Sequence, residues 1–160
     1  MKKRLVVVFM AAVLLCIGAS AVFAVDALLP GSATPLQIVV VRKATMQAIS
    51  ASFGDARAKL TAGTIKVISA NGKAIAAMAA SLPYLFGDAY SAVYPVGTSK
   101  IFFKAGPIAD FKTAAQVIVT AAEDLVKFAD ADDKANVEAQ IPKVQAACGA
   151  CHGVFRGQNP

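Results

Sequence analysis

The chain is poor in the residues that build metal sites and acid–base machinery. Its 160 residues include one histidine, His152, three cysteines and no tryptophan. A structural zinc site needs four ligands, so a site built on these residues would have to recruit carboxylates. If His152 binds a cofactor, no second histidine remains for acid–base catalysis.

The mature chain also lacks a basic cluster. Lys2, Lys3 and Arg4 begin a run that continues with apolar residues to Ile17 and small residues to Ala24. This order predicts a secretory signal peptide over residues 1–24, cleaved after Ala24 or Ala21. The apolar run is shorter than the roughly 20 residues that span a membrane.

The leader changes the charge and the cysteine count. Without it, 13 basic residues face 10 acidic ones, a net charge of +3, and Cys16 is removed. Cys16 is not expected to carry a lipid, because the bulky Leu15 stands before it where a lipoprotein signal has a small residue. Residues 25–160 are expected to form one exported, periplasmic domain. Nucleic acid and a stable membrane anchor are not expected as partners.

The most specific motif lies near the C-terminus. Cys148, Cys151 and His152 form C-x-x-C-H, the attachment signature of c-type haem. Two thiols at this spacing can each add to a vinyl group of one porphyrin, and the imidazole can bind the iron. On a helix, Cys148, Cys151, His152 and Phe155 share one face, so Phe155 is expected to cover the proximal side of the ring.

Three other interpretations of the two cysteines stay open. A redox dithiol usually opens a helix after a strand, whereas this motif ends a helical pattern. A zinc site lacks ligands, as described above. A disulfide within one helical turn would close almost no loop.

Hydrophobic periodicity predicts four helices: residues 35–62, 64–81, 107–129, and from a turn at 130–133 to about 156. Thr34 and Pro35 begin the first, Gly63 ends it, and Pro83 is expected to stop the second. Asn71-Gly72 reads as a weak spot in the second helix. Pro142 should kink or interrupt the fourth. The stripe expected to face the core of the first helix is Ile38, Arg42, Met46, Ile49, Phe53, Ala56 and Leu60.

Residues 82–106 are expected to form one long aromatic connection. The fold class is therefore all-α: an antiparallel four-helix bundle with one long crossover, no strands, and the haem inside near the C-terminus. The continuous apolar runs 38–41 and 74–80 exceed what one core covers, which predicts a homodimer through the first two helices.

The chain resembles the class II c-type cytochromes, the cytochrome c prime family, over roughly Pro35 to Arg156. The resemblance rests on three motifs. They are Cys148, Cys151, His152, Phe155 and Arg156; Arg42, Met46, Phe53 and Gly54; and Leu82-Pro83-Tyr84-Leu85-Phe86-Gly87. Departures are Lys43 for a frequent Gln, Phe102 or Phe103 for a frequent Trp, and Pro142 for a frequent Gly.

The resemblance implies one covalently attached haem c with His152 as fifth ligand to the iron. Members of the family either leave the sixth position open or fill it with a methionine from the first helix. We expect the open form, with Met46 packing over the distal face; Met46 as a second metal ligand is the alternative, and Met78 is a weaker candidate. Arg42 is expected to contact a haem propionate, and Arg156 to lie near the proximal face.

The sequence is compatible with three functional hypotheses. The first is an electron carrier or binder of nitric oxide or carbon monoxide, with a redox protein as partner. The second is a haem enzyme of the peroxidase type, which the missing distal histidine disfavours. The third is a helical bundle without a cofactor.

Overall fold

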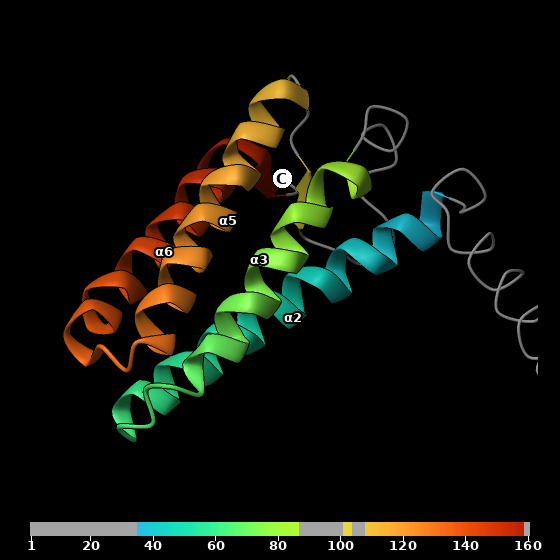
Figure 1. Ribbon diagram of the computed structural model, residues 1–160. Coiled ribbons are helices and arrows are strands. Elements are labelled where there is room, and N and C mark those ends of the chain that lie inside the picture. The colour runs from blue at the N-terminus through green and yellow to red at the C-terminus, as the bar shows by residue number, and fades with distance from the viewer. Residues whose placement is uncertain (1–34, 87–100, 104–107, 159–160) are drawn as a thin grey trace, which may run out of the picture. The chain divides into compact units, whose positions relative to one another are not determined.

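The computed structural model describes residues 35–86, 101–103 and 108–158, and the side chains of 37–86 and 109–156. Four helices carry the fold: α2 (Pro35–Thr61), α3 (Ile68–Leu85), α5 (Ile108–Asp130) and α6 (Lys134–Phe155) (Figure 1). Two short strands, β1 (Ile101–Phe103) and β2 (Arg156–Gln158), accompany them. The expected leader, and Tyr90 and Tyr94 of the expected connection, lie outside the described residues.

Neighbouring helices run antiparallel, as the bundle prediction requires. The start of α2 contacts the end of α3 through Arg42 and Leu85. The end of α3 meets the start of α5, where the rings of Phe86 and Phe111 lie 4.8 Å apart. Phe111 in turn lies 5.0 Å from Phe155 at the end of α6. These contacts define one end of the bundle, the motif end, at which the long connection joins α3 to α5.

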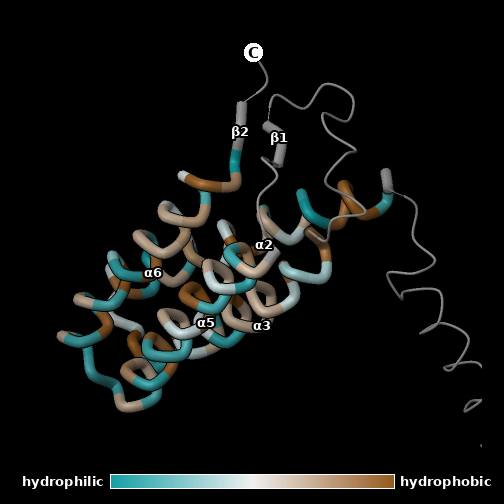
Figure 2. The backbone as a smooth tube through the Cα atoms, turned by 90° about the horizontal axis from the view of Figure 1, so that it is seen from above, coloured by the Kyte–Doolittle hydropathy of each residue, from teal (hydrophilic) through white to brown (hydrophobic). Residues whose placement is uncertain are grey.

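The opposite end, the turn end, holds the two short connections (Figure 1). Gly63 ends α2 with a positive φ of 73°, which glycine adopts without a steric penalty. The Thr64 amide then donates to the Lys59 carbonyl at 3.0 Å. In the second turn Asp132 has φ 56°, a conformation that aspartate tolerates better than most residues. In Figure 2 the turn before α6 is coloured hydrophilic, as expected for an exposed connection.

The stripe expected to face the core in the first helix is buried or half-buried along its whole length in α2. In α5 the buried residues recur every three or four positions; they are Phe111, Ala115, Ile118, Ala122, Leu125 and Ala129. In α6 the residues Val137, Ile141, Val144, Cys151 and Phe155 are buried. These apolar faces drive the bundle together, since removing apolar surface from water contributes roughly 25 cal/mol per Å².

Three expectations about the elements are corrected. First, α3 begins at Ile68 and not at Thr64, because residues 62–67 form a connection from which Ile65 reaches the core. Second, α3 continues past Pro83 to Leu85, where the Phe86 amide donates to the Leu82 carbonyl at 3.1 Å. Third, the chain is not free of strands.

The strand pair joins the end of the long connection to the C-terminus. Strands β1 and β2 are antiparallel, with Phe102 opposite Gly157 and Phe103 opposite Arg156. The sequence did not predict this pair because three-residue strands carry no usable periodicity. It fixes the backbone immediately after the C-x-x-C-H motif.

The buried residues form two clusters. The motif-end cluster contains Cys151 and Phe155 and spans all four helices. It comprises Ile49, Ile75, Ala79, Leu82, Phe86, Phe111, Ile118, Val119, Ala122, Ala147, Cys151 and Phe155. The turn-end cluster holds no residue of the motif. It comprises Ala56, Ile65, Ile68, Leu125, Ala129, Val137, Ile141 and Val144.

Candidate cofactor site

The last turns of α6 present the motif to the motif-end cluster. Cys151 is buried, with 4% of its surface exposed, and Cys148 is half-buried against the same cluster. His152 lies on the exposed side of these turns. The helix runs through Pro142 without interruption, and the Arg156 amide donates to the His152 carbonyl where it ends. Of the four residues expected to share one face, Cys151 and Phe155 are buried, Cys148 is half-buried and His152 is exposed.

Both cysteines are free thiols, which removes the support for a structural disulfide. Burial raises the pKa of the Cys148 thiol above its ordinary value. Burial, and then repulsion from Cys148, raises the pKa of the Cys151 thiol as well. Redox dithiols depend on a lowered thiol pKa, so these cysteines lack the electrostatics of that class.

His152 is held in the neutral form that binds metals. The protein on one side of the ring desolvates it, and the positive charge of Arg156 adds to this effect, so the pKa of His152 lies below its usual value. Neutral imidazole is the form of histidine that coordinates iron. Within the described part of the chain, no group of three or more His, Cys, Asp or Glu side chains could hold a metal ion by itself. The zinc interpretation gains no support from these residues.

Arg42 is almost fully buried, with 1% of its surface exposed. Its Nε donates a hydrogen bond to the Leu85 carbonyl, and its guanidinium carbon lies 4.5 Å from the centroid of the Phe86 ring. A carbonyl at the end of α3 attracts a cation because helix C-termini carry partial negative charge. Arg42 is therefore a buried arginine and not a solvated one at the surface.

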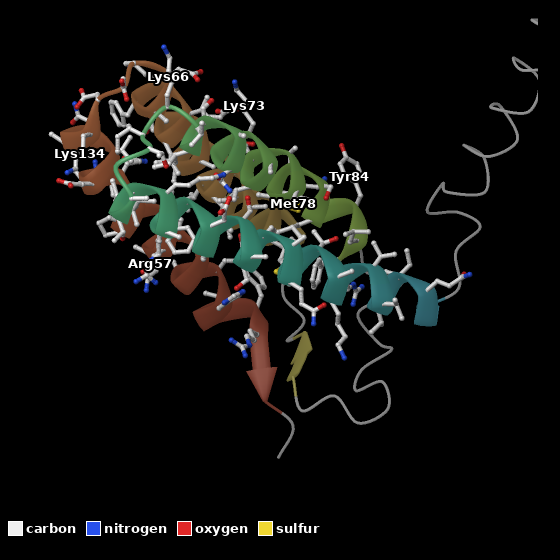
Figure 3. The ribbon with its side chains drawn as sticks, turned by 90° about the horizontal axis from the view of Figure 1, so that it is seen from below. Arg57, Lys66, Lys73, Met78, Tyr84 and Lys134 are labelled. Atoms are coloured by element: carbon white, nitrogen blue, oxygen red, sulfur yellow. The ribbon has the colours of Figure 1, made fainter. Side chains whose placement is uncertain are left out.

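Both methionine candidates lie at the motif-end cluster. Met46 on α2 and Met78 on α3 are half-buried, and both pack against this cluster, as Cys148 does. Figure 3 labels Met78 on α3. The structure thus brings Met46, Cys148, Cys151 and Phe155 to one apolar region.

The sequence did not predict the row of stacked side chains, called the ring chain below, that runs through the motif-end cluster from Arg42 over three phenylalanine rings. Arg42, Phe86, Phe111 and Phe155 contact one another in succession and link α2, α3, α5 and α6. Offset and edge-to-face ring pairs of this kind are favourable beyond their area burial. The signal in the sequence is Phe86 within the Leu82–Gly87 motif, and the sequence alone places this motif in the long connection.

The residues present suit a flat apolar cofactor. Two free thiols and one neutral imidazole lie within two turns of α6, beside a cluster of buried apolar side chains that includes three aromatic rings. A porphyrin needs this combination of attachment points, an iron ligand and an apolar enclosure. Fold and donor set together define a helical-bundle cytochrome of the c type.

The chain belongs to the cytochrome C' family, whose model matches residues 37–156. Solved structures agree with this assignment. Cytochrome c' from Thermochromatium tepidum is 25% identical with a TM-score of 0.66, over 79% of this chain and 98% of that chain. The nitric oxide complex of a cytochrome c prime variant from Alcaligenes xylosoxidans is 24% identical with a TM-score of 0.64, over the same shares.

A third similar structure is a cytochrome c' described by its ligand-controlled dimer dissociation, 24% identical with a TM-score of 0.64, over 79% of this chain and 98% of that chain. Among curated proteins, none matches the chain. Proteins of this family carry a covalently attached haem c, and the chain is a member. Its cysteines near the C-terminus fit that attachment.

Proposed function

We propose that the protein is an exported c-type haem protein that transfers electrons, binds small diatomic molecules such as nitric oxide or carbon monoxide, or does both. The observation that carries the proposal is the placement of Cys148 and Cys151 against the apolar motif-end cluster on which Met46 packs, with His152 next to Cys151 on the exposed side of α6. In this proposal Cys148 and Cys151 hold the haem by thioether bonds and His152 binds the iron. The signal peptide over 1–24 and the domain 25–160 belong to the same proposal.

The haem supplies a metal that changes its charge by one and can bind a diatomic ligand. The protein's part is to anchor, enclose and tune it. Phe155 and the ring chain exclude water from one side, because their side chains are buried among apolar neighbours. Arg42 is placed to neutralise a propionate, which lowers the free-energy penalty of burying that carboxylate. Arg156, one turn after His152, holds a positive charge near the proximal side.

Acid-acetone extraction of purified protein tests the attachment. The haem should stay on the polypeptide in wild type, and the visible spectrum in pyridine should be that of a haem with two thioether bonds. Haem that partitions into the solvent would contradict the proposal. An oxidation assay with hydrogen peroxide and an organic donor tests the peroxidase alternative, for which the described residues offer no distal histidine.

We infer a five-coordinate iron with Met46 over its open face. Met46 is half-buried at the motif-end cluster, and an apolar, crowded face admits small neutral ligands and disfavours charged or bulky ones. Complexes with nitric oxide and with carbon monoxide are known for variants of the Alcaligenes xylosoxidans relative. The alternative is a six-coordinate carrier in which the Met46 thioether is the second ligand.

Met46→Ala separates these two forms. If Met46 only crowds the iron, the variant binds carbon monoxide faster by about tenfold, since one steric barrier is removed, and its ferric spectrum stays high-spin. Met78→Ala is the matched control on α3 and should change both observations less. A near-infrared sulfur-to-iron band in wild type that disappears in Met46→Ala would make Met46 an axial ligand.

We further propose a homodimer through α2 and α3. Val40 and Val41 on α2 and Tyr84 on α3 are exposed large hydrophobic residues, with Tyr84 72% exposed. Figure 3 shows the Tyr84 side chain pointing away from the bundle. A related cytochrome c' is a dimer that dissociates under ligand control. Light scattering at micromolar concentration should give twice the monomer mass, and Val41→Glu should lower it; a monomer in wild type would refute the dimer.

A further inference from the structure

The last turn of α3 presents a carbonyl group and an aromatic ring to the same side chain of α2. Helix α3 continues past Pro83 to Leu85, and Phe86 is its C-cap residue. The Leu85 carbonyl accepts a hydrogen bond from Nε of Arg42, and the guanidinium carbon of Arg42 lies over the Phe86 ring, 4.5 Å from its centroid. Two consecutive residues at the end of α3 therefore hold one cation of α2.

The two contacts restrain the guanidinium in different ways. The hydrogen bond from Nε fixes one edge of the planar group. The ring attracts its face, because the quadrupole of an aromatic ring places negative charge above and below the ring plane. An arginine side chain has many rotamers, and the two restraints together favour one orientation of its planar fork.

Phe86 is itself supported from behind. Its ring is buried and lies 4.8 Å from the ring of Phe111, which lies 5.0 Å from the ring of Phe155. Phe155 stands one turn after Cys151 on α6. The ring under Arg42 thus belongs to a packed row that reaches the attachment motif, and the guanidinium is fixed relative to the motif-end cluster.

We infer that Phe86 is a positioning residue for Arg42 and, through Arg42, raises the reduction potential of the haem. The inference rests on the proposed function, in which Arg42 neutralises a propionate. A positive charge near the haem disfavours the ferric state, because ferric iron carries one more positive charge than ferrous iron. A guanidinium that has lost the ring moves its charge away from the haem, so the reduction potential falls.

Replacement of the ring tests the effect on the potential. Phe86→Leu keeps an apolar side chain and removes the ring. Potentiometric titration of the holoprotein, with dithionite as reductant and ferricyanide as oxidant, should give an equilibrium constant for reduction about threefold lower than in wild type, a fall of about 30 mV for a one-electron couple. Phe86→Tyr keeps a ring and should stay within about 1.5-fold of wild type. An unchanged potential in Phe86→Leu would overturn the inference.

A double-mutant cycle shows whether Phe86 acts through Arg42. Arg42→Gln removes the charge and should lower the potential by itself. Phe86→Leu should then shift the potential in the wild-type background and leave it unchanged in the Arg42→Gln background, because the effects of two residues that act as a unit are not additive. Equal shifts in the two backgrounds would mean that Phe86 acts by packing alone. A wild-type potential in Arg42→Gln would equally overturn the inference, since Phe86 would have no relevant charge to position.

Two further variants separate the ring's electrostatics from its volume. Phe111→Leu makes the same change at the next buried ring of the row, and it should shift the potential less than Phe86→Leu does. Site-specific incorporation of 3,4,5-trifluorophenylalanine at position 86 keeps the ring in place and depletes the negative charge of its face, so the protein should fold and its equilibrium constant for reduction should fall about twofold. An equal shift in Phe111→Leu, or no shift on fluorination, would contradict the positioning role.

Nuclear magnetic resonance supplies a readout that does not depend on electron transfer. In the ferrous protein saturated with carbon monoxide, which is diamagnetic, the Nε–H of Arg42 should exchange slowly with solvent, because it is buried and hydrogen-bonded to the Leu85 carbonyl. The exposed Arg57 and Arg156 supply internal references. In Phe86→Leu the Arg42 Nε–H should exchange at least about fivefold faster. Failure of the proposed function would appear as protein without covalent haem, whereas failure of this inference would appear as an unchanged Arg42 signal in Phe86→Leu that carries haem.

Discussion

At the scale of single residues, Asn71 and Gly72 fix how α3 packs, a role that helix propensity, the basis of the expected weak spot, does not describe. Asn71 is buried, and its amide donates to the Asp55 carboxylate at 2.8 Å and to the Ser52 carbonyl at 3.1 Å. Its Oδ1 accepts a hydrogen bond from Lys59 at 2.9 Å. These bonds join α3 to α2 and leave the Asn71 side chain satisfied, as a buried amide must be.

Gly72 serves the other side of α3. A Cβ at this position would lie 2.7 Å from Cγ2 of Val126 and 3.0 Å from the Ala122 carbonyl oxygen, so the glycine allows α3 and α5 to approach closely. Helix propensity alone penalises Asn-Gly, and the propensity scale contains no information on the neighbouring helix. The packing requirement therefore could not be predicted from the sequence.

Gly72→Ala should destabilise the protein although it improves helix propensity. The overlap with Val126 and the α5 backbone outweighs the propensity gain, for a net loss of about 1–2 kcal/mol in the free energy of unfolding. Denaturant unfolding followed by circular dichroism measures this. Gly54→Ala is the control: Gly54 is exposed on α2 with no atom within 4 Å of its Cβ position, so alanine there should stabilise. A stabilised Gly72→Ala would refute the close approach.

At the scale of elements, the long periodic segments were predictable and the short irregular ones were not. The bounds of α2, α5 and α6 agree with the periodicity within about two residues, because a buried stripe repeats over many turns. Helix α3 extends past Pro83 to Leu85, whose carbonyl accepts a hydrogen bond from Arg42 on another helix, a contact that the sequence pattern does not show. For the site, the spacing of Cys148, Cys151 and His152 was sufficient, whereas the ring chain through Phe111 depends on tertiary packing.

The start of α6 is capped by the side chain of Asp133. Asp133 accepts a hydrogen bond from the Asn136 amide at 3.1 Å and another from the Asn136 side chain at 2.6 Å. The Asn136 side chain, followed by its backbone amide, holds the pKa of Asp133 below its usual value of 3.8. Because the folded pKa is the lower one, the stabilisation is present above the unfolded pKa and is lost as pH falls through the folded pKa.

Asp133→Ala should lower the thermal midpoint by about 3 °C at neutral pH, because one capping acceptor disappears. The difference from wild type should shrink as pH drops below 3.8, where the wild-type carboxylate is protonated. Asp133→Asn keeps a capping oxygen without a titrating charge, so it should stay close to wild type at neutral pH. Thermal melts from pH 2 to pH 7 measure all three proteins, and a constant difference between wild type and Asp133→Ala would count against the charged cap.

At the scale of the whole molecule, the two ends of the bundle differ in what they require. The motif-end cluster includes Cys151 and packs against Cys148, while the buried residues of the turn-end cluster are aliphatic side chains packed on one another. The three ion pairs among the described side chains all lie at the turn end. The turn end is a hydrophobic core that needs no cofactor to fill it, whereas the motif end is the candidate cofactor site.

This division predicts a partly folded protein when haem cannot be attached. In Cys148→Ala/Cys151→Ala the turn-end cluster keeps its contacts, because none of them involves the motif. The motif end loses the group that fills it and opens more often, since stability within one domain need not be uniform. Hydrogen exchange should leave the amides around Leu125, Ala129 and Val137 protected and those around Phe111 and Phe155 exposed to exchange about tenfold faster than in the holoprotein. Leu125→Ala in the holoprotein is the reverse control and should weaken protection first at the turn end. Uniform loss of protection along all four helices in the haem-free variant would mean that the two clusters fold as one unit.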